Sequence, residues 1–192
     1  MTFNIDEFVN ELHKKFEQKY DPTWVMPSEI TTCLRKSFYV RKKGKNVVGE
    51  SAVYGIAIHN TVQDIAKKFN CEIEKEVTGK IDDIEIKGRA DLVCEDSVIE
   101  IKSTTIHDQR HYFQLAIYAK LLNLNKGYML YIDRDTANIT FFQIDVSFVF
   151  PFAVERVKAF KNAVVNNKLP PKEYSVLCKY CAYRTYCNND SF

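Results

Sequence analysis

Two carboxylates and a lysine could form a hydrolytic site within the stretch GRADLVCEDSVIEIKST, which begins at Gly88. If two antiparallel strands meet at a turn over residues 95–96, Asp91 lies directly opposite Glu100. Facing side chains have Cβ atoms about 4.5–5.5 Å apart, and like charges there are destabilising. A hard cation such as Mg²⁺ or Mn²⁺ would relieve that repulsion because it prefers carboxylate oxygens. Strand alternation places Lys102 on the face of Glu100, where an ammonium can orient a water or stabilise a phosphate.

An exposed strand face with an ordinary Glu100–Lys102 ion pair is the alternative interpretation of the same residues. The aspartate on the facing strand favours the hydrolytic interpretation, provided that the inferred register is right. This stretch therefore predicts a cation-dependent site whose geometry depends on one strand pairing.

Six cysteines form a second group with possible chemistry. No apolar run is long enough to span a bilayer, and MTFNIDEF does not resemble a signal peptide, so we expect a cytoplasmic protein with reduced thiols. The cysteines are then candidates for metal or cluster ligation rather than disulfides. Cys178-x2-Cys181 suits two ligands of one centre, and Cys187 could fold back as a third. This spacing fits zinc and an iron–sulfur cluster equally well.

The net charge of +2 hides a basic segment in the first quarter of the chain. Its members are Arg35, Lys36, Arg41, Lys42, Lys43 and Lys45. Such a run is either a solvated face or a groove that contacts phosphates.

The elements that must position these residues begin with helices. Residues 4–20 have the apolar spacing of an amphipathic helix, and Ser28 opens a second helical stretch that carries Cys33. A third helix is predicted over 51–69, with His59 at the edge of its apolar stripe. The stripe consists of Ile58, Val62, Ile65 and Phe69.

From residue 72 to 103 the apolar period changes to two, which predicts four consecutive short strands: CEIEKEVTG, DIEIKG, RADLV and SVIEIKS. A helix over 108–124 follows, then strands at GYMLYID and NITFFQID, then a helix over 147–166. This order predicts one α/β domain with a mixed sheet. Its parts are a helical region (1–70), a core (71–168) and a cysteine-rich tail (169–192).

Three short motifs resemble those of a known nuclease group. Asp91 followed by Glu100-Ile101-Lys102 resembles the signature of the PD-(D/E)XK nuclease superfamily in its RecB-like form. The run Gly55-Ile-Ala-Ile-His59 resembles the helix whose histidine completes the metal site. The run Gln114-Leu-Ala-Ile-Tyr118 resembles the QxxxY motif, whose two polar residues share one helix face. The proline of the superfamily name is absent, since Arg89-Ala90 precedes the aspartate.

Four of the cysteines extend this resemblance to about residues 26–187. Cys33 together with Cys178, Cys181 and Cys187 resembles the split four-cysteine iron–sulfur site of the same group. The chain length, without an attached helicase, is similar to that of the CRISPR-associated RecB-like exonucleases, the fourth family of Cas proteins. Cys71 and Cys94 match no ligand position, and we expect them to be core thiols. We expect His107 and His111 to be surface or DNA-side residues.

The resemblance implies a restriction-endonuclease-like fold and a role for each motif residue. Lys102 would position the attacking water, and Gln114 and Tyr118 would support the metal site and the DNA strand. A [4Fe–4S] cluster would join the tail to the N-terminal helices. The implied ligands of Mg²⁺ or Mn²⁺ are His59, Asp91, Glu100 and the carbonyl of Ile101.

The implied function is a metal-dependent DNA exonuclease that degrades single-stranded DNA or DNA ends, often in the 5′ to 3′ direction, with endonuclease activity as an open addition. Its cellular role would be to trim fragments before CRISPR spacer acquisition, beside the integrase. A virus- or mobile-element-encoded nuclease of replication or recombination would carry the same motifs. A zinc-stabilised nucleic-acid-binding module with structural carboxylates is the rival from another class, and the complete set of His, Asp, Glu and Lys disfavours it.

Overall fold

The computed structural model describes residues 4–7, 10, 23–43 and 50–189, and the side chains of 50–53 are outside this description. Most of the helix predicted over 4–20 and all of Lys45 lie outside the described residues. The strands are β1 (Trp24–Val25), β2 (Glu72–Ile81), β3 (Ile84–Cys94), β4 (Ser97–Ser103), β5 (Lys126–Ile132) and β6 (Ile139–Ile144). The helices are α2 (Leu34–Lys43), α3 (Glu50–Ala66), α4 (His111–Leu121), α5 (Val146–Val165) and α6 (Arg184–Asn188). Short 3₁₀ helices are η1 (Pro27–Ile30), η2 (Lys67–Phe69) and η3 (Val176–Tyr180).

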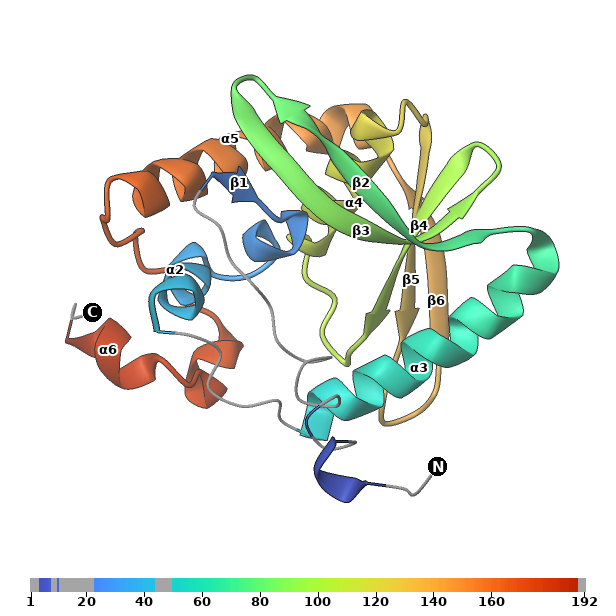
Figure 1. The fold of residues 1–192 in the computed structure, drawn as a ribbon, viewed down its shortest axis with the longest axis horizontal. Helices are drawn as coiled ribbons and strands as arrows, with labels where there is room; N and C mark the ends of the chain where they lie inside the picture. The colour runs from blue at the N-terminus through green and yellow to red at the C-terminus, as the bar shows by residue number, and fades with distance from the viewer. Residues whose placement is uncertain (1–3, 8–9, 11–22, 44–49, 190–192) are drawn as a thin grey trace.

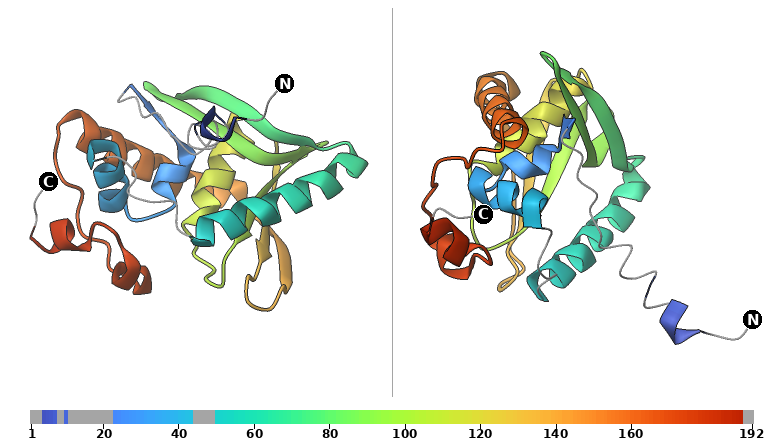
Figure 2. Two further views of the ribbon diagram at one scale, coloured as in Figure 1. Left: turned by 60° about the horizontal axis from the view of Figure 1, so that its bottom comes forward. Right: turned by 60° about the vertical axis from the view of Figure 1, so that its left-hand side comes forward.

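The strands form one mixed sheet in the order β1-β3-β4-β5-β6, with β2 paired to the other edge of β3. The parallel strands β4 and β5 are joined through α4, whereas β3–β4 and β5–β6 are antiparallel. Helix α3 covers one face of the sheet, and α4 and α5 cover the other (Figures 1 and 2). The predicted α/β class with a mixed central sheet is confirmed. None of the helices in the described part of the chain is long and apolar enough to span a bilayer.

Strand β3 is one continuous strand where two short strands were predicted. It pairs with β2 from Ile81↔Ile84 to Glu72↔Val93, so Gly88 in its middle does not interrupt the ladder. A Cβ atom at that glycine would lie 2.5 Å from the Tyr118 hydroxyl oxygen. The glycine is therefore required by the close approach of a helix side chain rather than by a turn.

The N-terminal prediction needs two corrections. Cys33 lies between η1 and α2 rather than on a helix, because the first helical turn ends at Ile30. The basic segment is also divided: Arg35 Nε donates to the Pro170 carbonyl at 2.7 Å, and Arg41 forms an ion pair with Glu29 at 2.6 Å. These two arginines hold the fold together, and the exposed members among the described residues are Lys36, Lys42 and Lys43.

The apolar stripe predicted for the third helix is wrong in its second half. Ile65 and Phe69 are 51% and 71% exposed. Val62 of the predicted stripe packs against Leu92 and Ile101 of the sheet, together with Ala66 in place of Ile65 and Phe69. Since His59 precedes Val62 and Ala66 by three and seven positions, it lies on the sheet-facing side of α3 rather than at an edge.

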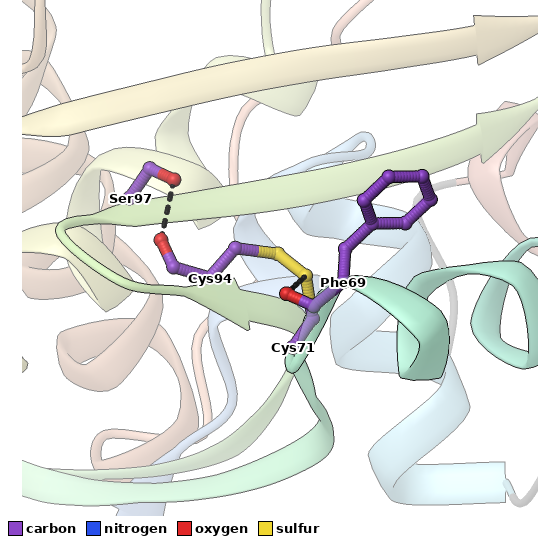
Figure 3. Close-up of a disulfide and its surroundings, with 4 residues drawn as sticks. All are labelled: Phe69, Cys71, Cys94 and Ser97. Carbon is purple, nitrogen blue, oxygen red and sulfur yellow. Dashed lines mark hydrogen bonds between the residues drawn. A yellow bond between two sulfur atoms is a disulfide. The ribbon is translucent and has the colours of Figure 1, made fainter.

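Cys71 and Cys94 form a disulfide, with Cα atoms 4.3 Å apart (Figure 3). The expectation that both are core thiols is wrong in this structure. The β2–β3 register explains the pairing: Glu72 opposes Val93, so the cysteines occupy the next opposing positions. Their proximity follows from a register between segments 23 residues apart.

The C-terminal tail lies beside α2 at the end of the molecule away from the middle of α3 (Figures 1 and 2). Tyr39 of α2 stacks on Tyr183 with ring centroids 5.6 Å apart, and Lys43 Nζ lies 4.2 Å from the centroid of the Tyr186 ring. Aromatic contacts therefore join the N-terminal helical part to the tail.

Candidate active site

Strands β3 and β4 diverge at the predicted site. The inferred register is confirmed for Val93↔Val98 and Leu92↔Ile99, but the ladder ends there. Asp91 and Glu100 are therefore not a strand pair, which corrects the predicted geometry. The Ile101 N–H donates instead to Asp91 Oδ2 at 2.8 Å. Because the aspartate carboxylate replaces a ladder acceptor, the two strands are no longer paired beyond Leu92↔Ile99.

Glu100 is the first residue of β4 beyond this paired stretch, and its side chain is only 1% exposed. Its Oε1 accepts a hydrogen bond from Lys102 Nζ at 2.6 Å, and its Oε2 is buried with no hydrogen-bond partner among the described residues. Burial, followed by the Asp91 charge, raises the pKa of Glu100 to about 8, although the Lys102 ammonium opposes both effects. A cation would lower the cost of ionising this carboxyl.

His59 reaches the same place from α3. Its Nδ1 lies 3.7 Å from Asp91 Oδ1, and its side chain is 28% exposed. Within the part of the chain that the structure describes, no three His, Cys, Asp or Glu side chains form a ready-made metal centre. His59 and Asp91 contact each other, and Glu100 accepts a hydrogen bond from Lys102. The unpartnered Glu100 oxygen and the mixed N/O donor set still fit a divalent cation.

Helix α4 supplies the supporting residues Gln114 and Tyr118, which are both buried. Gln114 Oε1 accepts from Lys102 Nζ at 3.2 Å. The Tyr118 hydroxyl accepts from the Arg89 backbone N–H at 3.2 Å, on the edge of β3 opposite β2, between the residues that pair with β1 and those that pair with β4. Burial and the Glu100 and Asp91 charges raise the pKa of Tyr118, so its hydroxyl stays neutral. The interpretation from sequence missed Gly88, whose signal was a glycine inside an alternating strand.

Beside Lys102, Tyr131 of β5 contacts His107 and His111. His111 is half-buried, with Nδ1 3.0 Å from the Tyr131 hydroxyl oxygen, so it is not simply a surface residue. Burial, followed by the Lys102 charge, lowers the pKa of His111 to about 4, which keeps it neutral near pH 7. His107 is exposed and stacks on the Tyr131 ring.

The four cysteines of the predicted cluster are free and half-buried. Glu173 connects their two segments: its Oε1 accepts from the Leu34 N–H at 3.3 Å, next to Cys33, and its backbone carbonyl accepts from Cys178 Sγ at 3.8 Å. As at the carboxylate site, the described cysteines are not gathered into a ready-made metal centre. Thiols on two segments joined in this way are the donor set that a cluster requires.

Comparison with known proteins identifies the scaffold. The family model of the PD-(D/E)XK nuclease superfamily matches residues 32–139, which contain every residue of the carboxylate site. The chain belongs to the PD-(D/E)XK nuclease superfamily. The divergent strands, the buried glutamate and its lysine are therefore parts of a nuclease of this type.

One sequence relative and two solved proteins with a similar fold extend the comparison beyond the matched residues. The CRISPR-associated exonuclease Cas4 of Saccharolobus solfataricus is 28% identical over 210 residues, which cover 95% of this chain and 97% of that protein. The crystal structure of SSO0001 has a TM-score of 0.74 at 24% identity and covers 96% of both chains. The alkaline exonuclease of Laribacter hongkongensis has a TM-score of 0.51 at 11% identity, covering 76% of this chain and 89% of that one. Its complex with dAMP gives a TM-score of 0.53 at 11% identity.

Proposed function

We propose that this nuclease is a divalent-metal-dependent DNA exonuclease that acts on single-stranded DNA or single-stranded DNA ends. The observation that carries the proposal is Glu100, a buried carboxyl with one unpartnered oxygen, held by Lys102 at the point where β3 and β4 cease to pair. Burying a carboxyl oxygen without a hydrogen-bond partner costs free energy, so such a group is not expected in a core that serves stability alone. The exonuclease relatives support DNA as the substrate class.

The proposed ligands are His59, Asp91, Glu100 and the carbonyl of Ile101. A bound Mg²⁺ or Mn²⁺ would supply activation of a water and neutralisation of charge on the phosphate. Asp91 is already oriented by the Ile101 N–H, which leaves its Oδ1 directed toward His59. Small movements of His59 and Glu100 would bring the side-chain donors together.

Lys102 acts as a positioned hydrogen-bond donor that orients the attacking water in this proposal. Its ammonium has three N–H donors, and two of them are directed at Glu100 and Gln114. The third remains for the attacking water or for a phosphate oxygen. Gln114 orients the lysine, and the neutral hydroxyl of Tyr118 holds the separated edge of β3 in place.

For the finer assignment, we propose 5′ to 3′ degradation and a role in CRISPR spacer acquisition beside the integrase, supported by the likeness to the Cas4 exonuclease. We further propose that Cys33, Cys178, Cys181 and Cys187 hold a [4Fe–4S] cluster. The free thiols and the Glu173 bridge between their segments support this assignment.

Cleavage of end-labelled DNA tests the function. Lys102→Ala should lower metal-dependent cleavage roughly 100- to 1,000-fold, the loss typical of one preorganised donor. Lys126→Ala, which removes an exposed lysine paired with Asp96, should leave the rate unchanged. Circular single-stranded DNA separates exonuclease from endonuclease action, and 5′ against 3′ labels give the polarity. DNA binding without cleavage in Mg²⁺ or Mn²⁺ would contradict the exonuclease proposal and favour a nucleic-acid-binding module.

A further inference from the structure

A column of aromatic rings crosses the sheet beside the carboxylate site. The Tyr131 ring stacks on Phe142 of β6, with centroids 6.1 Å apart and planes at 12°. On Tyr131 lies the imidazole of His107, with centroids 4.0 Å apart and planes at 25°. Tyr131 is fully buried, whereas His107 is exposed. The column therefore begins in the core and ends in a ring that reaches the surface.

The segment that carries His107 is anchored by contacts of the residues that follow it. The Tyr131 hydroxyl donates to the Asp108 carbonyl at 3.4 Å and contacts His111 Nδ1. The Asp108 carboxylate accepts from Arg110 Nε at 2.9 Å, and Arg110 pairs with Glu173 at 3.2 Å. Because the ring lies on a supported surface, little conformational entropy is lost when a planar ligand stacks on it.

The column is also adjacent to the proposed chemistry. Tyr131 and Lys102 are direct partners in the β4–β5 ladder, so the imidazole covers the residue beside the lysine. His107 and Lys102 both contribute to lowering the pKa of His111, which places the three side chains in one neighbourhood.

We propose that His107 is a positioning residue whose outer ring face stacks on one nucleobase of the DNA strand, close to the phosphate that is cleaved. The proposal rests on the deoxyribonuclease function proposed above and names how that site holds its substrate. Stacking of a base on an aromatic ring contributes about 1–3 kcal/mol and tolerates all four bases, because each base has a π-face. The platform would set the register of the strand without selecting its sequence.

Abasic scanning of a single-stranded substrate tests the register. One nucleotide at a time is replaced by an abasic site, and kcat/KM is measured for the intact protein, His107→Ala and His107→Phe. The intact protein should lose about 5- to 150-fold at one position, the factor equivalent to about 1–3 kcal/mol of stacking. His107→Ala should show the same loss of kcat/KM on DNA without an abasic site, and an abasic site at the sensitive position should cause no further loss. His107→Phe should behave like the intact protein.

Phe148→Ala is the matched control, because it removes another exposed ring from α5, 68% exposed. It should leave the abasic profile unchanged. An equal abasic loss in the intact protein and His107→Ala at every position would overturn the proposal, since contacting groups should be non-additive.

A binding measurement separates this proposal from the nuclease proposal. 2-Aminopurine is placed at the sensitive position, or at each position in turn if no cleavage occurs, and its fluorescence is read in chelator. Quenching should appear with the intact protein and His107→Phe and be lost with His107→Ala. If this quenching pattern is seen but DNA is not cleaved in Mg²⁺ or Mn²⁺, the exonuclease proposal is contradicted and the stacking proposal is supported. Equal quenching in all three proteins would overturn the stacking site whether or not DNA is cleaved.

Discussion

At the scale of single residues, the site depends on the environment of Glu100 more than on its identity. Glutamate and lysine two positions apart on a strand are common on exposed faces. Here the glutamate is buried, its Oε2 has no partner in the described structure, and the lysine is shared with Gln114. Ionising this carboxyl therefore costs free energy unless a cation is bound beside it.

Stability without metal should therefore depend on pH through Glu100. Its pKa is about 8 in the folded protein and ordinarily 4.5, so unfolding releases a proton between these values. The free energy of unfolding should be greatest below about pH 4.5 for this group, fall as pH rises toward 8, and level off above it. Glu100→Gln should flatten the decline in thermal melts recorded in chelator.

Glu155→Gln is the control for that experiment, because Glu155 is 77% exposed on α5. It should leave the pH profile unchanged, and Mg²⁺ should stabilise the intact protein near pH 8 but not Glu100→Gln. A pH profile shared by the intact protein and Glu100→Gln would contradict the buried, proton-binding carboxyl.

At the scale of elements, β3 and α4 fit together at one glycine. A methyl group at Gly88 would meet the Tyr118 hydroxyl at 2.5 Å and Pro27 Cδ at 3.1 Å. Gly88→Ala should therefore lower stability by about 1–3 kcal/mol, the usual cost of overpacking, and should lower activity by displacing Tyr118. Denaturant unfolding and cleavage assays measure the two effects.

Gly55 of α3 is the matched position with the opposite expectation. A Cβ atom there meets nothing within 4 Å, so Gly55→Ala should raise stability by about 0.5–1 kcal/mol through helix propensity. Equal effects of the two substitutions would contradict the close approach of α4 to β3.

The disulfide between β2 and β3 provides a third prediction. Cys71–Cys94 closes a loop across a sequence separation of 23, which in the chain-entropy account stabilises by about 3 kcal/mol. Reduction, or Cys71→Ser with Cys94→Ser, should lower the melting temperature, and a reductant should not lower that of the double mutant further. Identical melts of the intact protein with and without reductant would show that the bond contributes nothing.

At the scale of the whole molecule, the tail and the N-terminal helical part are held together by a few contacts. Glu173 accepts from Arg110, Arg156 and the Leu34 N–H, while Tyr183 stacks on Tyr39. The proposed cluster would join the same two segments covalently, since three of its cysteines are on the tail and one precedes α2.

Anaerobically purified protein should therefore be brown and contain about four irons per chain. Serine at Cys33, Cys178, Cys181 or Cys187 should remove the colour, and protease should then cut the tail first because metal binding is coupled to folding. Serine at Cys71 or Cys94 should leave the iron content unchanged. Stoichiometric zinc without iron would end the cluster proposal and leave the nuclease scaffold untouched.

Features that depend on neighbouring residues could be predicted from the sequence. The period-two pattern, the turn before Ser97 and the helical spacing of Gln114 and Tyr118 correctly predicted the mixed sheet, the β3–β4 register up to Leu92↔Ile99, and the helix that faces the site. These are local properties, since each depends on backbone geometry over a few positions.

The way in which separated segments meet could not be predicted from the sequence and is seen in the folded protein. It set the face of α3 that carries His59, the β2–β3 register that joins Cys71 to Cys94, and the divergence of β3 and β4 beyond Leu92. It also decided the pKa of Glu100 and the placement of His107 on Tyr131. Burial and long-range register depend on the packing of the whole chain at once, and no window of local sequence contains that information.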